Sequence, residues 1–537
     1  MKPILAVAGL VLALAAAHVP ASAVGPSLPS TNISWLTAAA EADVDRAFAQ
    51  ARASKKPVLL YWGATWCPPC NQLKATLFNR ADFAALSKSF VAVHVDGDRP
   101  GAQKLGSRFK VAGYPTVVLF TPQGQEITRL PGEADAPQVM AVLQSGLSGG
   151  RPAKAVLSDA LAGKPLPTGE WKMLSFYSWG TDEQQLVPKA DVPGTLVKLA
   201  VAHAALPGAD AETTTRLWLK ALASSDDGKG VKPDDALRER VMKVLADPAA
   251  SRTHMDVLTN SADGIVRVLD GDAAAEAGKP GSPLVQAFEA ALKRLEVDAT
   301  LSRGDRMGAL YARVLLARLG EPKDAVQVKL PEALLKDVRE HAARADRDST
   351  DAYERMVVIP FGGGLLAKAG LWDESDALLK ANLAKALTPY YLMSQLGGNA
   401  RRLGRKEEAL NWYGQAFDKS EGAATRLQWG SGYLGALVDL APQDAVRIEK
   451  TASQLFTAAA KDSGAFEGRS VRSLQRVAAK LASWNAGGAG TSASALKRLQ
   501  AQLGAVCKKA PAGDRRTACE GVLKATAAAS AAPKKTA

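Results

Sequence analysis

The sequence predicts an α/β domain at the N-terminus followed by a large all-helical region, and three observations support this division. Short apolar runs alternate with amphipathic stretches up to residue 148. After the Gly-Gly pair at residues 149–150, long segments rich in Ala, Leu, Lys and Arg are interrupted by Gly and Pro, a pattern typical of helices. A chain of 537 residues also exceeds what one hydrophobic core usually organises, so at least two domains are expected.

The first domain is predicted to span residues 35–148. Residues 43–54 are Ala-rich and amphipathic, which indicates a helix, and a second helix should begin at Cys67. Short apolar runs predict strands at residues 57–62, 90–95, 117–120 and 126–130, the last two forming a hairpin around a turn at 122–124.

The helical region is predicted to span residues 171–520, after a linker at 149–170 and before a disordered tail at 521–537. It contains a weak repeat, because residues 369–379 resemble residues 403–413, with Gly370 and Gly404 at equivalent positions. The 34-residue spacing resembles that of tetratricopeptide repeats, in which helix pairs bury their apolar faces by stacking. We therefore expect the side chains of Ala409, Leu410, Tyr413 and Phe417 to face neighbouring helices.

The first 23 residues have the pattern of a secretory signal peptide. Lys2 is followed by an apolar run over residues 4–17 and by small residues at 21–23. The run is shorter than the about 20 apolar residues that span a bilayer, which favours cleavage over a permanent anchor. Residues 24–34 are rich in Pro, Ser and Gly and read as a linker. We expect a periplasmic or secreted protein with no stable membrane span after cleavage.

The chain is basic, with 67 Lys and Arg against 54 Asp and Glu and a formal net charge of +13. Because the basic residues are spread along the chain without an Arg-rich aromatic platform, we expect a solvated basic surface and no nucleic-acid partner.

Two of the four cysteines form a C-x-x-C pair, Cys67 and Cys70, in the segment Trp66-Cys67-Pro68-Pro69-Cys70. The pair lies where a predicted strand gives way to a predicted helix, and three-residue spacing on a first helical turn brings the two sulfurs within bonding reach. The helix N-terminus favours the thiolate of Cys67, so Cys67 is expected to attack and Cys70 to resolve. A zinc site is the alternative, but no second ligand pair lies nearby, so we expect no metal and no cofactor.

The chain resembles the thioredoxin family over residues 35–148. The resemblance rests on the W-C-x-x-C after a central strand, on Val95-Asp96, and on Gly113-Tyr114-Pro115-Thr116 before the next strand. It implies a thioredoxin-like fold in which Pro115 is a cis-proline beside the disulfide. It also implies that Trp66, Tyr114 and Pro115 line the substrate site.

Four residues depart from the usual pattern or bear on the direction of electron flow. Tyr61 stands where thioredoxins commonly have a buried Asp, and Ala92 where they have a Lys, which leaves the proton acceptor for Cys70 unassigned. Pro68 and Pro69 carry no amide hydrogens, so two donors that could stabilise the Cys67 thiolate are absent. A moderately stabilised thiolate favours a reductant over a strong oxidant.

Cys507 and Cys519 flank a turn-like segment between two helical stretches and are predicted to form a structural disulfide, with a second redox centre as the alternative. The aromatic residues Trp171, Phe176, Tyr177 and Trp179 are expected to pack at the domain join, with a binding patch as the alternative.

The sequence thus predicts a protein-disulfide oxidoreductase that exchanges electrons with a protein disulfide client and a thiol electron donor. Its helices would dock a protein partner. Two alternatives stay open: a non-catalytic interaction scaffold, and a disulfide oxidase or isomerase that uses the same site residues.

Overall fold

The computed structural model describes residues 33–527 except 133, 183–184, 226–227, 272–280, 323 and 488–490. The predicted signal peptide, most of the linker that follows it, and residues 528–537 of the predicted tail lie outside these ranges.

The N-terminal domain is built on a mixed five-stranded sheet in the order β1-β3-β2-β4-β5. β1, β3 and β2 run parallel, β4 is antiparallel to β2, and β5 pairs with β4 as the predicted hairpin. The strands are β1 Leu36–Ala38, β2 Val58–Gly63, β3 Val91–Asp96, β4 Thr116–Phe120 and β5 Glu126–Leu130. Four of the five were predicted from the sequence, and β1, with only three residues, was not.

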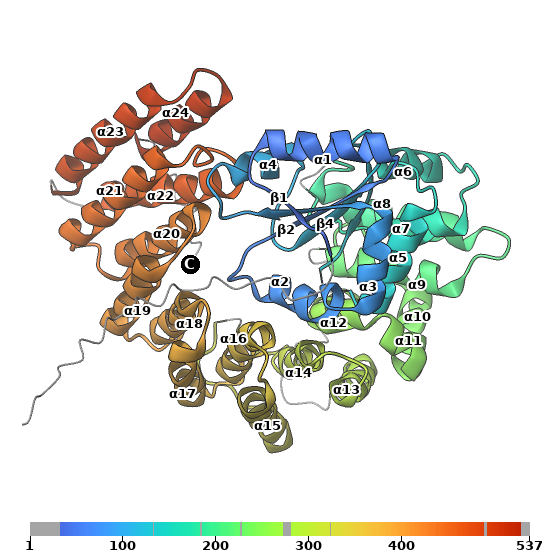
Figure 1. The fold of residues 1–537 in the computed structure, drawn as a ribbon. Coiled ribbons are helices and arrows are strands. Elements are labelled where there is room, and N and C mark those ends of the chain that lie inside the picture. Colours follow the sequence, from blue (N-terminus) through green and yellow to red (C-terminus); the bar gives the residue numbers. More distant parts are fainter. Residues whose placement is uncertain are drawn as a thin grey trace, which may run out of the picture.

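Helices cover both faces of this sheet (Figure 1). α1 (Glu41–Ser54) and α4 (Ala102–Arg108) pack on one face. α2 (Pro68–Leu73), α3 (Ala81–Leu86) and α5 (Ala136–Leu147) pack on the other, with a π-helical turn, Lys74–Phe78, directly after α2. Because successive side chains of a strand point to opposite faces, β2 sends Leu60 and Trp62 to the first core and Leu59 and Tyr61 to the second.

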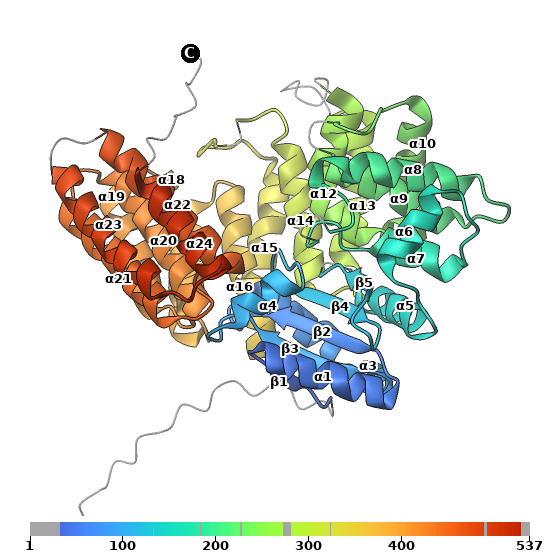
Figure 2. The ribbon, with the colours of Figure 1, turned by 90° about the horizontal axis from the view of Figure 1, so that it is seen from above.

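The rest of the described chain is helical. Figures 1 and 2 show the helices as a curved array that passes around the α/β domain from α8 to α24. The helices are α6 Ala153–Leu161, α7 Thr168–Phe176, α8 Val192–Ala204, α9 Ala211–Ser224, α10 Asp235–Ala246, α11 Pro248–Thr253, α12 Met255–Asp270, α13 Pro283–Val297, α14 Arg303–Ala317, α15 Glu332–Asp348, α16 Ala352–Lys368, α17 Trp372–Asn382, α18 Pro389–Arg402, α19 Lys406–Lys419, α20 Ala423–Leu440, α21 Ala445–Lys461, α22 Gly468–Gly487, α23 Thr491–Lys509 and α24 Asp514–Ala527.

Two segments differ from the sequence prediction. The predicted linker 149–170 contains α6, whose Val156 and Leu157 are buried in the core of the helices that follow. The predicted tail from residue 521 begins inside α24, which continues to Ala527 and buries Val522. Both segments are short amphipathic stretches next to sequence rich in Gly, Pro or Ala. They form helices because their apolar faces pack against a neighbouring hydrophobic core.

The two glycines of the sequence repeat lie at turns between helices. Gly370 follows α16 with φ +81°, and Gly404 follows α18 with φ +72°, a left-handed conformation that glycine adopts without strain. Ala409, Leu410 and Phe417 of α19 are buried, as expected for the inner face of a stacked helix pair. The assignment of the region to tetratricopeptide repeats stays a prediction.

The aromatic residues after residue 170 lie at the join between the two regions. Trp171, Tyr177 and Trp179 are buried in the core of the first helices, whereas Phe176 is buried in the core under the sheet. The Arg216 guanidinium of α9 lies 3.5 Å from the centroid of the Phe176 ring. These residues therefore pack the domains together rather than form an exposed patch.

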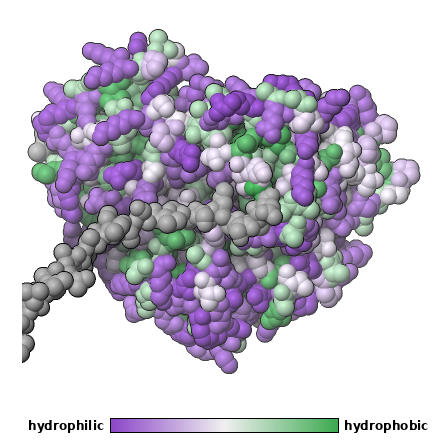
Figure 3. Space-filling view, in the orientation of Figure 1, coloured by the Kyte–Doolittle hydropathy of each residue, from purple (hydrophilic) through white to green (hydrophobic). Residues whose placement is uncertain are grey.

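The surface visible in Figure 3 is mostly hydrophilic, with small scattered hydrophobic residues. Within the described ranges, no helix combines the length and the apolarity that crossing a membrane requires.

His94 on β3 is partly buried on the sheet face that also carries Tyr61. Its ring stacks on Tyr61 of β2, with centroids 5.0 Å apart and planes 13° apart. Burial lowers the pKa of His94 to about 4, and the nearby charges of Lys74 and Arg99 act in the same direction. The folded protein therefore holds this imidazole in its neutral form.

We predict that His94→Phe removes a pH-dependent part of the stability. The unfolded chain binds a proton at His94 below its ordinary pKa of 6.5, so the contribution is present above pH 6.5 and is lost as the pH falls toward 4. The change from 6.5 to about 4 corresponds to about 3 kcal/mol. Urea denaturation at pH 4.5 and 7.5 should show the wild type losing stability relative to the variant at the lower pH. A difference between the two proteins that does not vary with pH would contradict this account.

Candidate functional site

The two cysteines of the C-x-x-C pair are bonded to each other at the start of α2. Cys67 is the N-cap residue of the helix, Pro68 and Pro69 begin it, and the Cα atoms of the cysteines lie 5.2 Å apart. The amide of Cys70 donates to Cys67 Sγ over 3.2 Å. Pro68 and Pro69 have no amide hydrogen, so in the first turn of this helix the backbone donor to Cys67 Sγ is the amide of Cys70.

The loop before β4 supplies the second part of the site. The peptide bond between Tyr114 and Pro115 is cis. A Cβ on Gly132 would lie 2.7 Å from the Pro115 ring, so the absence of a side chain at residue 132 lets the two loops approach. The Tyr114 hydroxyl accepts a hydrogen bond from Gln103 Nε2 over 2.8 Å, and its ring meets Trp66 edge-on with centroids 6.2 Å apart.

The groups next to Cys70 differ from the usual family pattern, as the sequence indicated. The Tyr61 hydroxyl is buried without a hydrogen-bond partner among the described residues, and burial raises the pKa of Tyr61, so it stays a neutral phenol. Lys74 follows Cys70 by four residues, which places both on one side of the helix. It is only 6% exposed, and burial lowers the pKa of its amine. Its Nζ lies 3.4 Å from Asn71 Oδ1.

Residues of the helical region contact Trp66, the residue directly before Cys67. Tyr391 of α18 stacks on the Trp66 ring, with centroids 6.1 Å apart and planes 22° apart, and Trp429 of α20 meets it edge-on at 6.0 Å. The Arg469 guanidinium of α22 lies 4.7 Å from the Trp66 ring centroid and 4.9 Å from that of Tyr114. Three helices from the far end of the chain therefore border the redox pair.

Asp98, in the loop after β3, joins the two regions at this point. Its carboxylate accepts from Trp66 Nε1 over 2.8 Å and from the Thr425 hydroxyl over 2.5 Å, while its carbonyl accepts from Ala423 N over 3.1 Å. Burial raises the pKa of Asp98 to about 6, opposed chiefly by the hydrogen bond from Thr425. A Cβ on Gly422 would lie 2.6 Å from Asp98 Cβ, so a glycine is needed for this close approach.

The structure brings the sequence-predicted residues Trp66, Cys67, Cys70, Tyr114 and Pro115 into one region. Cys67 is 2% exposed and Trp66 8% exposed, so the pair is covered rather than open to solvent.

Four residues of the site were missed from the sequence: Asp98, Tyr391, Trp429 and Arg469. Their sequence neighbourhoods carry no redox motif, and no pattern along the chain links α18, α20 or α22 to residue 66.

Cys507 and Cys519 form the second disulfide, with Cα atoms 5.4 Å apart. They join α23 to α24 and are buried in the C-terminal helical core, away from α2 (Figure 1). The described residues contain no group of three or more His, Cys, Asp or Glu that could hold a metal ion.

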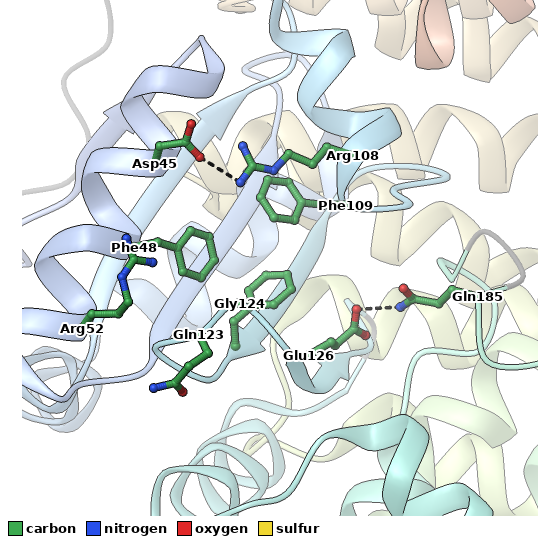
Figure 4. Close-up of a pocket in the computed structure, with 10 residues that line it drawn as sticks. Asp45, Phe48, Arg52, Arg108, Phe109, Gln123, Gly124, Glu126 and Gln185 are labelled. Atoms are coloured by element: carbon green, nitrogen blue, oxygen red, sulfur yellow. Dashed lines mark hydrogen bonds and ion pairs between the residues drawn. The ribbon is translucent and has the colours of Figure 1, made fainter.

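A pocket of about 410 Å³ lies on the opposite face of the sheet, between α1, α4 and the β-hairpin. In Figure 4, Arg108 points toward Asp45 and Gln185 toward Glu126, at 2.9 and 2.6 Å. No cysteine lines this pocket, so it is separate from the Cys67–Cys70 pair.

Comparison with known proteins finds similarity in the N-terminal domain. A family model described as a thioredoxin-like domain matches residues 44–147. The thiol:disulfide interchange protein DsbD 1 of Pseudomonas aeruginosa is 33% identical over 122 residues, which are 22% of this chain and 20% of that protein. A second DsbD protein of the same organism is 31% identical over 120 residues, again 20% of its length. This chain thus matches about a fifth of the length of these relatives.

Two smaller proteins match over most of their own length. The solution structure of a thioredoxin from Thermus thermophilus is similar at 27% identity with a TM-score of 0.19, covering 21% of this chain and 85% of that one. A thioredoxin-like protein of Synechocystis sp. is 36% identical over 91 residues, which are 17% of this chain and 82% of that protein. With its C-x-x-C pair at residues 67–70, the chain belongs to the thioredoxin-like proteins through its N-terminal domain.

Proposed function

We propose that the protein is an exported thiol–disulfide oxidoreductase that reduces protein disulfides through Cys67 and Cys70. The observation that carries this proposal is the bonded cysteine pair at the start of α2. Trp66, directly before Cys67, contacts the ring of Tyr114, directly before the cis-proline Pro115. The similarity of this domain to thiol:disulfide interchange proteins supports it. Export rests on the signal-peptide pattern of residues 1–23.

The proposed reaction transfers two electrons to the client. The Cys67 thiolate attacks one sulfur of the client disulfide, forming a mixed disulfide and releasing the other client sulfur as a thiolate. The Cys70 thiolate then attacks Cys67 Sγ, which releases the second client sulfur and closes the Cys67–Cys70 bond. The client takes up two protons, and a thiol electron donor reduces the pair again.

The reducing direction is supported by the first turn of α2. With prolines at residues 68 and 69, the Cys67 sulfur receives one backbone hydrogen bond, from Cys70 N. A thiolate with few donors is a weaker leaving group, and its disulfide is a weaker oxidant. The helical region would hold the protein partner while exchange takes place.

The second disulfide, Cys507–Cys519, is proposed to be structural. It closes a short loop and is buried between α23 and α24 in the C-terminal core, whereas the cis peptide bond found among the described residues lies before Pro115 in the N-terminal domain.

The first test compares the reduction of a disulfide in a flexible peptide by the wild type, Cys67→Ser and Cys507→Ser. We expect Cys67→Ser to fall to the uncatalysed rate, because the attacking sulfur is lost, while Cys507→Ser keeps its activity. Cys70→Ser should instead accumulate a mixed disulfide at Cys67, which mass spectrometry of the trapped adduct identifies. Equal activity of wild type and Cys67→Ser would support the scaffold alternative.

The second test concerns the direction of electron flow. Absorbance of the reduced protein at 240 nm, followed against pH with Cys67→Ser as the blank, reports ionisation of the Cys67 thiol. We predict a pKa above about 5, because only one backbone donor reaches the sulfur. A value below about 5 would favour the oxidase alternative.

A further inference from the structure

The helical region contributes more to the redox site than a scaffold would. Trp66 is held on three sides by side chains of α18, α20 and α22, and the loop after β3 is hydrogen-bonded to the start of α20 through Asp98. Two further backbone contacts fix α22: Arg469 N donates to Gln103 Oε1 over 2.9 Å, and Gly468 N donates to Ser107 Oγ over 3.2 Å. The approach to Cys67 is therefore shaped by both regions.

This arrangement limits how a client disulfide can reach Cys67. A sulfur must come within about 3–3.5 Å of Cys67 Sγ to react, yet Cys67 is 2% exposed. A disulfide on an extended chain segment occupies less space around its sulfurs than one on a folded surface, so an extended segment is the client form that fits a covered cysteine.

A pocket of about 560 Å³ lies between α18, α19, α20 and α22, and its size lies in the range of ligand sites. Trp429 connects the two places, because it lines the pocket and also meets the Trp66 ring. The pocket therefore borders Trp66 through the Trp429 ring, and a chain segment bonded to Cys67 would lie next to it.

The pocket is positively charged. Its lining includes the cations of Arg401, Arg476 and Lys480 against a single carboxylate, Asp439, which pairs with Arg401 over 2.9 Å and with Lys480 over 2.6 Å. Arg476 is thus left without an acidic partner in the lining, and within the described part of the chain it donates a hydrogen bond to the Ser473 hydroxyl.

Two more arginines of α22 add to the positive electrostatic potential of the pocket. Arg469 and Arg472, beside Arg476 on α22, both lower the pKa of Arg476, after burial as the larger cause. Arg469 Nη1 is also buried without a hydrogen-bond partner among the described residues, next to Trp66. An acceptor supplied by a bound segment would satisfy it.

We infer that the face formed by Trp429, Arg469 and Arg476 is a client-binding subsite that takes an extended segment with acidic residues beside its cysteine. The inference rests on the proposed thiol–disulfide exchange and names the client that this site prefers. Carboxylates of the segment would pair with Arg469 and Arg476, and the net charge of +13 would speed the encounter with an acidic chain.

The test uses the full chain, reduced beforehand, and two flexible peptides of equal length that carry one cysteine in a mixed disulfide with a chromogenic thiol. One peptide has Glu and the other Lys on both sides of the cysteine. We expect the wild type to react at least about tenfold faster with the acidic peptide, and we expect added salt to reduce the ratio. Arg469→Gln and Arg476→Gln should each bring the ratio toward one.

A matched control is Arg498→Gln, which removes an exposed guanidinium on α23 that pairs with Glu449 and should keep the wild-type ratio. Equal rates for the two peptides, or a preference that survives both α22 variants, would overturn the subsite. A small neutral disulfide, bis(2-hydroxyethyl) disulfide, separates the two levels of the account. If the protein reduces this small disulfide but reacts equally fast with the two peptides, only the subsite is rejected. If it reduces neither the small disulfide nor either peptide, the proposed function is rejected and the subsite with it.

Discussion

The Asp98 carboxylate accepts hydrogen bonds both from the indole of Trp66, next to Cys67, and from the hydroxyl of Thr425, at the start of α20. A buried carboxylate lowers the stability of the folded protein unless its oxygens accept hydrogen bonds. The two donors to Asp98 come from different regions of the chain, so the carboxylate is satisfied only when both regions are in place. The two regions consequently hold each other in register at the redox pair. Together with the hydrogen bonds of Gly468 and Arg469 to α4, this bond holds the rings of Tyr391 and Trp429 and the Arg469 guanidinium against Trp66.

The sequence predicts the sheet domain well because its signals are local. β2 is a continuous apolar run, and the alternation of Leu59 and Tyr61 with Leu60 and Trp62 matches the two cores of the folded domain. The C-x-x-C pair and the G-Y-P-T segment likewise carry their geometry in a few adjacent residues. The helix at 153–161 was missed because neighbouring glycines and prolines resemble a linker, and its apolar face is decided by helices that follow much later in the chain.

The residues of the helical region that contact Trp66 could not be predicted, because these contacts join segments that are far apart in the sequence. Arg469 and Trp429 are ordinary helical residues in their own neighbourhoods, and their role depends on the path of the whole helical array. Similarity to thiol:disulfide interchange proteins covers the N-terminal domain alone, so it describes the chemistry of the pair and not the helices that border it. The position of Tyr61 shows a related limit: the substitution is visible in the sequence, but its unpartnered hydroxyl and the buried amine of Lys74 are visible only in the structure.

The central claim is that one of the two disulfides exchanges electrons while the other holds helices together. It is tested most directly by equilibrating the oxidised protein with a graded series of dithiol and disulfide buffers, quenching with acid, alkylating the free thiols and reading each cysteine by peptide mass. We predict that Cys67 and Cys70 become reduced together in one two-electron transition, at potentials where Cys507 and Cys519 stay bonded. Reduction of the Cys507–Cys519 bond at the same or a less reducing potential, or resistance of the Cys67–Cys70 bond across the series, would contradict the account.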